Sequence, residues 1–306
     1  MSRIRIGVIG LGKIATDQHL PAIHSNLCFE LAATVHRSSE PSALNFSTHE
    51  AMLRSVELDA VAITTPPAPR YAIARDCIEA GLHLLLEKPP TATLAEIEDL
   101  RERAAARGVS LFTTWHAQHN PAVAAAASLL ADQPIRTMRI TWHEDVHKWH
   151  PGQRWIWEAG GFGVFDPGIN AFSIATLIFP GPLFVREAAL HFPDSSHTPI
   201  AADIRFASPD CDGPLECSLD WRRAAGEEWT ISIITEAGLA IDLLEGGARL
   251  VVDGVVRETG GDGEYPDIYR RFAQLIGEGR SHVDLLPIGM VADCFLIGSR
   301  HAADPV

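Results

Sequence analysis

Positive charge is scarce in this sequence. Lysine and arginine together number 25 against 39 aspartates and glutamates, which gives a formal net charge of −14. Nucleic-acid binding needs a basic surface that meets the phosphates, so this balance argues against nucleic acid as a partner. An acidic exterior also suits a neutral substrate better than an anionic one.

Cysteines and long apolar runs are also few. The five cysteines are odd in number, widely spaced and contain no C-x-x-C pair. Neither a disulfide framework nor a thiolate metal site is therefore indicated. No apolar run approaches the roughly 20 residues that span a bilayer, and no separate apolar leader precedes the first strand pattern. We expect a cytoplasmic protein with no membrane contact.

A regular alternation of strand and helix patterns fills the first part of the chain. Apolar, β-branched runs predict strands at residues 3–9, 29–35, 59–64, 82–86 and 109–114, and helical spacing predicts helices at 70–80 and 93–107. Thr93 and Glu96 form a capping box, and Gly81 and Gly108 are suitable residues to end the two helices. This order predicts an α/β domain with a doubly wound parallel sheet.

The rhythm changes after about residue 118. Alternating runs predict strands at 136–142, 186–192, 200–206, 215–221, 229–235, 239–244 and 249–252, several of them separated by turn residues. Such an order predicts an antiparallel meander. Two helices, near 266–276 and 287–299, are expected to close the chain. We therefore divide the chain into residues 1–118 and an α+β domain of residues 119–306 with a large, mostly antiparallel open sheet, whose C-terminal helix can pack back on the first domain.

A glycine motif follows the first strand. Gly10, Gly12 and Ala15 fit G-x-G-x-x-G/A between a strand and a helix. Gly10 would form the tight turn, Gly12 would let the backbone approach a pyrophosphate, and the helix N-terminus would face the anion. The motif predicts a dinucleotide-binding Rossmann domain, with Lys13 and Ile14 as neighbouring cofactor contacts.

The end of the second strand indicates which dinucleotide binds. An acidic residue there would hold the ribose 2′-hydroxyl, but the sequence reads His36-Arg37-Ser38. Arg37 can pair with a 2′-phosphate and stack on adenine, and Ser38 can donate to the phosphate. These residues favour NADP, with NAD possible. The alternative is that Arg37 is an ordinary solvated arginine.

Three later segments resemble one enzyme family. They are Thr64-Thr65-Pro66-Pro67, the run Glu87-Lys88-Pro89, and the glycine-rich stretch from Gly160 to Asn170. Together they resemble the GFO/IDH/MocA oxidoreductases, and with residues 149–157 most of all those members that oxidise D-galactose or L-arabinose at C1. The resemblance implies a sugar bound between the two domains over the nicotinamide and oxidised to the lactone. It also implies cofactor contacts from Thr65, Pro66, Glu87 and Lys88.

One departure from the family pattern affects the chemistry. Asp and His usually stand four apart in the second motif, whereas this chain has Asp166 and Asn170. An asparagine cannot exchange a proton at neutral pH, so Asn170 can only position a hydroxyl. Asp166 or Lys88 must then be the base. Asp166 is favoured because a lysine carries a proton at neutral pH unless burial lowers its pKa strongly.

Aromatic residues strengthen the sugar hypothesis, because the apolar C–H face of a sugar packs on aromatic planes. By resemblance, Trp149 and Trp229 are expected to contact the substrate, while Trp142, Trp155 and Trp221 are expected in the core. The polar groups of His116 and Glu144 are expected to bind hydroxyls. The complete expected substrate set is Lys88, His116, Glu144, Trp149, Asp166, Asn170 and Trp229.

Residues 143–147 match the zinc-protease signature H-E-x-x-H. That chemistry needs both histidines on one helix face, but a strand pattern leads into His143 and Pro151-Gly152 breaks the chain soon after. We expect no metal. Two rival functions remain open, a non-catalytic NAD(P)-binding regulator of the same fold and a reductase of another carbonyl or diol. A homodimer through the exposed face of the large sheet is also expected.

Overall fold

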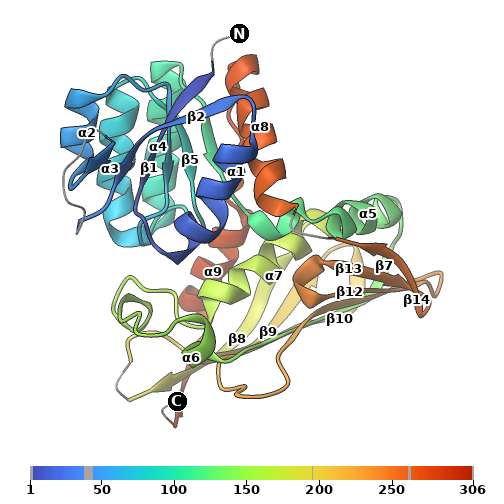
Figure 1. Cartoon of the computed structure of the whole chain (residues 1–306). Helices are drawn as coiled ribbons and strands as arrows, with labels where there is room; N and C mark the ends of the chain where they lie inside the picture. Colours follow the sequence, from blue (N-terminus) through green and yellow to red (C-terminus); the bar gives the residue numbers. More distant parts are fainter. Residues whose placement is uncertain (1–2, 38–43, 195, 261–262, 305–306) are drawn as a thin grey trace. The chain divides into compact units, whose positions relative to one another are not determined.

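A computed structural model describes residues 3–37, 44–194, 196–260 and 263–304 (Figure 1). The chain forms two compact units. Unit 1 comprises Met1–His116 and Glu264–Asp284, and unit 2 comprises Ala117–Gly263 and Leu285–Val306. The first boundary lies close to the predicted residue 118. The segment Glu264–Asp284, which the sequence analysis placed in the second domain, belongs to unit 1.

Unit 1 is built on a parallel sheet of six strands in the order β3-β2-β1-β4-β5-β6. The strands are β1 (Ile4–Ile9), β2 (Phe29–Val35), β3 (Asn45–Phe46), β4 (Ala60–Ile63), β5 (His83–Leu86) and β6 (Leu111–Thr113). One face carries η1 (Ala15–His19), α1 (Leu20–Ser25) and α8 (Glu264–Glu278), and the other carries α2 (His49–Ser55), α3 (Pro67–Glu79) and α4 (Leu94–Arg107) (Figure 1). The predicted doubly wound sheet is confirmed.

Helix α8 belongs to unit 1 because its apolar side chains complete that unit's core. Tyr265, Ile268, Tyr269, Phe272 and Leu275 recur at helical spacing and are all buried. The rings of Tyr269 and Phe272 lie 5.4 and 6.0 Å from the ring of Phe29 at the start of β2. The free energy gained by burying this row of aromatic side chains outweighs the cost of bringing a distant segment of the chain back to unit 1.

Unit 2 contains a sheet of nine strands in the order β14-β13-β12-β11-β7-β10-β9-β8-β15. The strands are β7 (Ile135–His143), β8 (Phe184–Pro193), β9 (Ala201–Ser208), β10 (Cys211–Asp220), β11 (Glu228–Thr235), β12 (Ala240–Leu244), β13 (Arg249–Val252), β14 (Val255–Thr259) and β15 (Ser299–Ala303). Most neighbours are antiparallel, as predicted, but β10 runs parallel to β7 and β15 parallel to β8. The prediction of a single antiparallel meander is therefore wrong, because β7 lies between two groups of antiparallel strands, β8–β10 and β11–β14.

Helices cover one face of this sheet and leave the other open. The covering helices are α5 (Pro121–Leu130), α7 (Phe165–Ile178) and α9 (Leu286–Ile297) (Figure 1). Short helical turns complete the unit, namely η2 (His116–His119), α6 (Val146–Trp149), η3 (Trp155–Trp157) and η4 (Glu245–Gly247). The first residue of η2, His116, is the last residue of the first segment of unit 1. Side chains of β9 and β10 alternate between buried and exposed positions, which is the pattern of a sheet with one solvated face.

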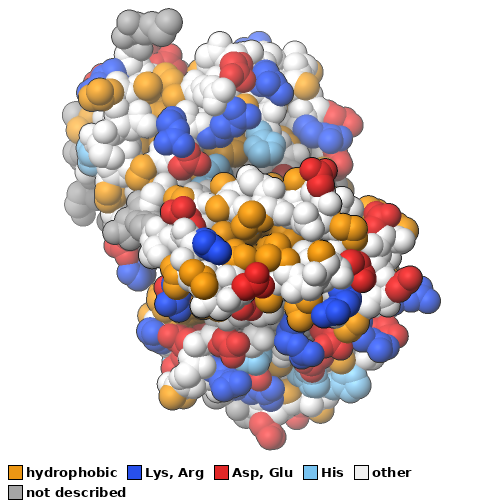
Figure 2. All heavy atoms as spheres, turned by 90° about the vertical axis from the view of Figure 1, so that its right-hand side faces the viewer, with side chains coloured by type: hydrophobic (Ala, Val, Ile, Leu, Met, Phe, Trp, Pro, Cys, Tyr) orange, Lys and Arg blue, Asp and Glu red, His pale blue; other side chains and the backbone are white. Residues whose placement is uncertain are grey.

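The surface shows no separation of charge on the face in Figure 2, where acidic and basic side chains of the described residues are interspersed. No helix in the described part of the chain is long and apolar enough to cross a membrane. All five cysteines carry thiols without a disulfide.

Candidate active site

The glycine turn after β1 has the shape that the sequence predicted. Gly10 adopts φ +104°, and a Cβ on it would lie 2.9 Å from the backbone nitrogen of Thr65. Its N–H donates to the Val35 carbonyl at 2.9 Å, which joins the ends of β1 and β2. No described protein atom lies within 4 Å of a Cβ placed on Gly12. Space therefore opens beside the backbone where helical turns begin, as a pyrophosphate needs.

The end of β2 lies next to this turn in the sheet order. The His36 N–H donates to the Phe46 carbonyl at 2.9 Å, and Arg37 is exposed directly after it. Ser38, the remaining residue of this predicted cofactor group, lies outside the described residues. An exposed guanidinium at this strand end fits the predicted contact with a 2′-phosphate.

A buried arginine that the sequence analysis missed fixes the ends of β4 and β5. Arg70, on α3, is 2% exposed, and its guanidinium donates to the carbonyls of Thr65, Glu87 and Pro89. The Thr65 hydroxyl oxygen is buried and has no hydrogen-bond partner among the described residues. A buried polar atom without a partner is costly, and a bound ligand would satisfy it. Thr65 thus fits its predicted role as a cofactor contact.

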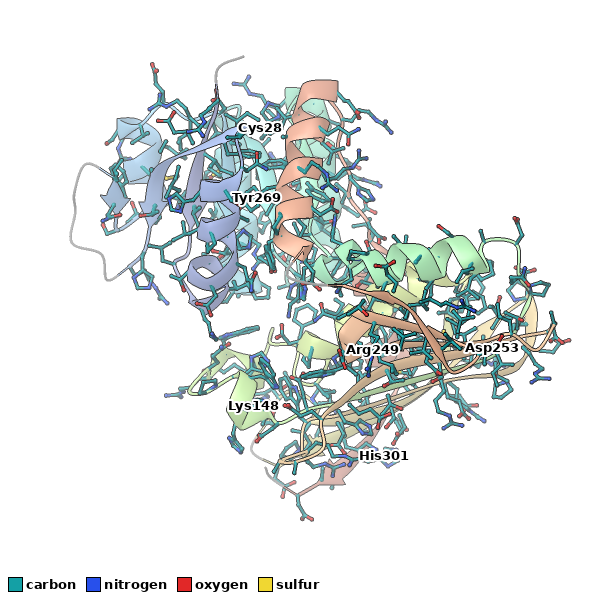
Figure 3. All side chains as sticks on the ribbon, turned by 45° about the vertical axis from the view of Figure 1, so that its right-hand side comes forward. Cys28, Lys148, Arg249, Asp253, Tyr269 and His301 are labelled. Carbon is teal, nitrogen blue, oxygen red and sulfur yellow. The ribbon has the colours of Figure 1, made fainter. Side chains whose placement is uncertain are left out.

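Glu87 is the centre of a buried hydrogen-bond network. Its Oε1 accepts from the Tyr265 hydroxyl at 2.6 Å and faces His19 Nε2 at 3.1 Å, and its Oε2 accepts from the Lys88 backbone N–H at 2.7 Å. Figure 3 labels Tyr269, whose hydroxyl lies 2.8 Å from His19 Nδ1. Burial would raise the pKa of Glu87, but His19, His116 and Tyr265 outweigh it and lower the pKa to about 2.

This network positions Lys88, since the Glu87 carboxylate holds the lysine's own backbone at the carboxyl end of β5. Ligands of doubly wound sheets bind at that edge. Nearby, His116 Nδ1 lies 2.9 Å from Glu264 Oε2. Burial lowers the pKa of His116, but the Glu264 and Glu87 carboxylates outweigh it and raise that pKa above its ordinary value, while Lys88 opposes them.

In unit 2, Asp166 lies in the first turn of α7 and is 4% exposed. Gly168 lets this turn approach the sheet, because a Cβ there would lie 2.5 Å from Leu219 Cδ1 on β10. His150 lies beside the carboxylate, with its Nε2 3.5 Å from Asp166 Oδ2. The sequence analysis missed His150, although its turn sequence His150-Pro151-Gly152-Gln153 is visible.

Asn170 lies one turn after Asp166 on the same helix. Its amide Oδ1 is buried and has no hydrogen-bond partner among the described residues. Residues four apart on a helix share a face, so the carboxylate and this oxygen point to the same side of α7. The pair can accept two hydrogen bonds from one polyhydroxyl ligand.

Both oxygens of the Glu144 carboxylate accept from indoles. Oε1 lies 3.2 Å from Trp221 Nε1, and Oε2 lies 3.1 Å from Trp229 Nε1. Trp221 is fully buried, as predicted, and its ring packs 5.3 Å from the His150 ring. Glu144 therefore holds both indoles in place, including the Trp221 ring that packs on His150, and its direct contact with a sugar stays a prediction.

Trp149 and Trp229 form an aromatic corner. Their rings meet edge to face with centroids 5.7 Å apart, and Trp149 is 41% exposed. Glu227, which the sequence analysis missed, accepts from the Trp149 indole and pairs with Lys148 (labelled in Figure 3). Burial raises the pKa of Glu227, but the bonds from Lys148 and Trp149 outweigh it and lower that pKa. The exposed part of the Trp149 ring can pack on the apolar face of a sugar.

The H-E-x-x-H residues do not lie on one helix. His143 ends β7, where its Nε2 lies 3.0 Å from Ser218 Oγ, while His147 lies on α6. Among the described residues, the ligand atoms of His49, Glu50 and Asp76 lie within 4.8 Å of one another. That group shares no residue with the predicted sites, and His49 already pairs with both carboxylates.

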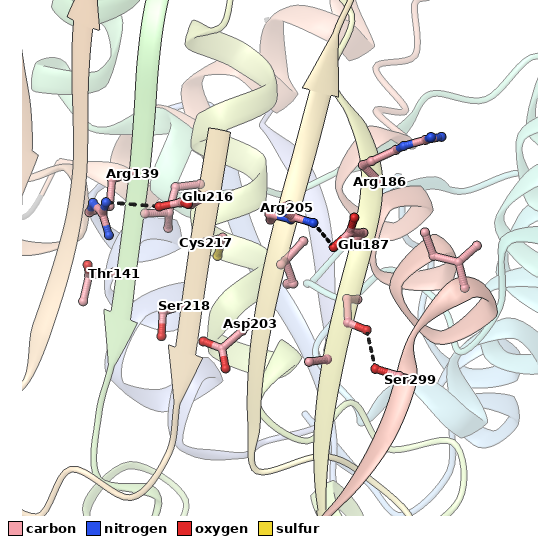
Figure 4. Close-up of a pocket in the computed structure, with 15 residues that line it drawn as sticks. Arg139, Thr141, Arg186, Glu187, Asp203, Arg205, Glu216, Cys217, Ser218 and Ser299 are labelled. Carbon is pink, nitrogen blue, oxygen red and sulfur yellow. Dashed lines mark hydrogen bonds and ion pairs between the residues drawn. The ribbon is translucent and has the colours of Figure 1, made fainter. Parts of the chain in front are cut away.

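A hollow of about 560 Å³ lies on the open face of the large sheet. Figure 4 shows Arg139 paired with Glu216 and Arg205 paired with Glu187 across neighbouring strands. Among the predicted site residues that the structure describes, none lines it. Two arginine–glutamate pairs cross it, and it is not the site that the sequence indicated.

A doubly wound sheet with a glycine turn at its switch point and a second unit with a buried carboxylate on α7 are features of a dinucleotide-dependent oxidoreductase. The profile of the oxidoreductase family with an NAD-binding Rossmann fold, GFO/IDH/MocA, matches residues 4–114. Galactose 1-dehydrogenase of Pseudomonas fluorescens is 43% identical over 98% of this chain and 97% of its own. The chain belongs to the GFO/IDH/MocA family and is an NAD(P)-dependent oxidoreductase.

Solved structures agree with this assignment. A D-galactose-1-dehydrogenase protein from Rhizobium etli is 46% identical, covers 100% of this chain and 98% of its own, and superposes with a TM-score of 0.94. KijD10, a 3-ketoreductase from Actinomadura kijaniata solved with NADP and TDP-benzene, is 18% identical with a TM-score of 0.80 over 99% of this chain and 100% of its own. The latter shares the fold.

Proposed function

We propose that the protein is an aldose 1-dehydrogenase that oxidises the anomeric C1 of an aldopyranose of the D-galactose type to the lactone, with L-arabinose as the other candidate substrate. The observation that carries the proposal is the first turns of α7, where the buried Asp166 and the unpartnered amide oxygen of Asn170 share a face. The relatives named galactose 1-dehydrogenase support the sugar class.

Asp166 accepts the proton of the C1 hydroxyl in this proposal. Asp166 lies in the first turn of α7, where the partial positive charge of the helix N-terminus favours a negatively charged group. Asn170 Oδ1 accepts a hydrogen bond from a second hydroxyl and orients the ring. The Trp149 and Trp229 rings pack on the apolar face of the sugar. Lys88 supports the developing oxyanion with its charge, and His116 and Glu144 complete the expected contacts.

A bound dinucleotide would supply the acceptor for the hydride that leaves C1. The residues of unit 1 fit such a group, since the space beside Gly12 is open and the Thr65 hydroxyl has no partner among the described residues. The proposed contacts are Gly10, Gly12, Lys13, Ile14, His36, Arg37, Ser38, Thr65, Pro66, Glu87 and Lys88. Because the Glu87 carboxylate already accepts from Tyr265 and Lys88, its contribution would come from its backbone or through Lys88. Arg37 favours NADP over NAD.

The test is the absorbance of the reduced nicotinamide with D-galactose, L-arabinose and D-glucose, each with NADP and NAD. Turnover of a galactose-type sugar is expected, with lactone as the product. In Asp166→Asn, kcat should fall by about 10²–10⁴, the usual effect of losing a general base. Binding of NADP should survive, because the proposed nucleotide contacts lie on unit 1. No turnover of any aldose by the wild-type protein would refute the proposal.

Lys88→Met provides the comparison. It should impair both turnover and cofactor affinity, since Lys88 is assigned to both. Near-normal turnover in Asp166→Asn together with complete loss in Lys88→Met would reverse the two roles and make the lysine the base.

We also propose that the open face of the nine-stranded sheet joins two copies of the chain. Large exposed sheet faces with mixed charges are suited to self-complementary contacts. Light scattering should give the mass of a dimer, and Glu216→Arg, which breaks the pair with Arg139, should give a monomer.

We also propose a cytoplasmic location for the protein, supported by its use of a nicotinamide dinucleotide. Cell fractionation tests this location.

A further inference from the structure

The proton that Asp166 accepts must reach solvent before the next turnover. The Asp166 side chain is 6% exposed, whereas that of His150, with Nε2 3.5 Å from Asp166 Oδ2, is 14% exposed. Asn170, the other polar group on this face of α7, cannot take a proton at neutral pH. The imidazole is therefore the more exposed of two neighbouring groups, and it can both accept and release protons.

Two hydrogen bonds define which nitrogen of His150 carries a hydrogen. Gln153 Oε1 accepts from the Trp155 indole at 3.1 Å, and an indole N–H can only donate, so this atom is the amide oxygen. The same oxygen lies 3.4 Å from His150 Nδ1. Nδ1 is therefore the protonated nitrogen of the neutral ring. Nε2, which faces Asp166, is the nitrogen that can accept a proton.

The local sequence holds this arrangement. In His150-Pro151-Gly152-Gln153, the Gln153 N–H donates to the His150 carbonyl at 3.2 Å, and Gly152 has φ +70°. Proline followed by glycine with a positive φ is the preferred sequence for a type II turn. The turn brings Gln153 back beside His150, and the Trp221 ring supports the imidazole at a centroid distance of 5.3 Å.

We propose that His150 is the proton relay of Asp166, an inference that rests on the proposed function. During oxidation, the O–H bond of the C1 hydroxyl breaks and an O–H bond forms on Asp166. That bond then breaks as an N–H bond forms on His150 Nε2, and the imidazolium gives this Nε2 proton to water, so that Nδ1 keeps its hydrogen. The carboxylate and the neutral ring are restored, and the relay needs no further reactant. His150 acts through Asp166, so it is a positioning and relay residue.

The first experiment compares His150→Gln with His147→Gln, which makes the same change at an exposed histidine on α6. In His150→Gln, kcat with galactose should fall by about ten- to a hundredfold, less than the 10²–10⁴ expected for loss of the base itself. KM should stay close to its wild-type value, because the relay acts after the sugar has bound. His147→Gln should match the wild type. Thermal melting checks that each variant is folded.

The second experiment separates a relay from a structural role. Added imidazole should restore kcat of His150→Gln in proportion to its concentration, and should leave the wild type and Asp166→Asn unchanged. In stopped flow with a pH indicator, proton release should coincide with nicotinamide reduction in the wild type and lag behind it in His150→Gln.

The outcomes are distinguishable. A wild-type protein that oxidises no aldose overturns the proposed function and the relay with it. If the wild type is active but His150→Gln keeps a normal kcat and releases its proton together with nicotinamide reduction, only the relay is overturned. The relay is also overturned if the loss in His150→Gln is a rise in KM, or a fall in kcat that imidazole does not restore.

Discussion

Replacing Glu144 with glutamine tests how the aromatic wall is held. The variant keeps the shape of the side chain but turns one of its two acceptors into an NH₂ group, which cannot accept. The wild-type carboxylate accepts from Trp221 at 3.2 Å and from Trp229 at 3.1 Å, so one indole must lose its acceptor. Trp221 is fully buried whereas Trp229 is partly exposed, so we expect the amide oxygen to stay with Trp221.

The size of the effect follows from the lost bond. A buried donor left without an acceptor costs about 1–3 kcal/mol, so the loss at the half-buried indole N–H of Trp229 should cost about 1 kcal/mol. Each kcal/mol lowers the melting temperature of a domain of this size by roughly 2–4 °C. The melting temperature of Glu144→Gln should therefore fall by several degrees. The Trp229 ring should also lose its fixed tilt against Trp149, which should raise KM for the sugar more than it lowers kcat.

A double-mutant cycle with Trp229→Phe isolates this cause. Phenylalanine keeps an aromatic ring and removes the N–H that would face the amide, so Glu144→Gln should cost much less in that background than in the wild type. Calorimetry on the four proteins gives the coupling free energy. Equal losses in both backgrounds would show that the indole of Trp229 is not what Glu144 holds.

Three further results are expected. Glu87, whose pKa is about 2 in the fold against an ordinary 4.5, stabilises the protein above pH 4.5, and this contribution of about 3 kcal/mol disappears as the pH falls toward 2. Acid unfolding of Glu87→Gln should therefore lack that pH dependence, and a parallel curve for the wild type would contradict it. Arg37→Ala should raise KM for NADP by an order of magnitude or more, about 1.5–3 kcal/mol for a charged hydrogen bond, with little change for NAD. Equal changes with the two cofactors would refute the role of Arg37. EDTA should leave turnover unchanged, and one bound zinc per chain would overturn the interpretation of His143 and His147.

Elements that are determined by a few neighbouring residues could be predicted from the sequence. The strand Phe29–Val35 has its predicted bounds, and the capping box of Thr93 and Glu96 forms at the start of α4. Gly108 ends that helix in the left-handed conformation, with φ 73°. In each case, a few adjacent residues fix the backbone by their own conformational preferences.

Features that depend on contacts made only in the folded chain could not be predicted from the sequence. Helix α7 is buried on nearly all sides, so its sequence lacks the polar face that produces a helical period. In addition, Pro167 and Gly168 near its start are residues typical of loops. His150 could not be paired with Asp166, because their contact depends on how the 150–153 turn packs on Trp221. The role of Tyr265 depends in the same way on a contact with Glu87, which is far from it in the sequence.

The place of α8 in unit 1 sets an order for the synthesis of the protein. When the ribosome has made the first 116 residues, all six strands of the parallel sheet exist, but the rings of Phe29 and Phe112 still lack Tyr269 and Phe272. That surface stays uncovered while about 150 further residues are translated. A fragment cut at residue 118 should therefore bind chaperones or aggregate, and adding residues 264–284 as a separate peptide should restore its solubility.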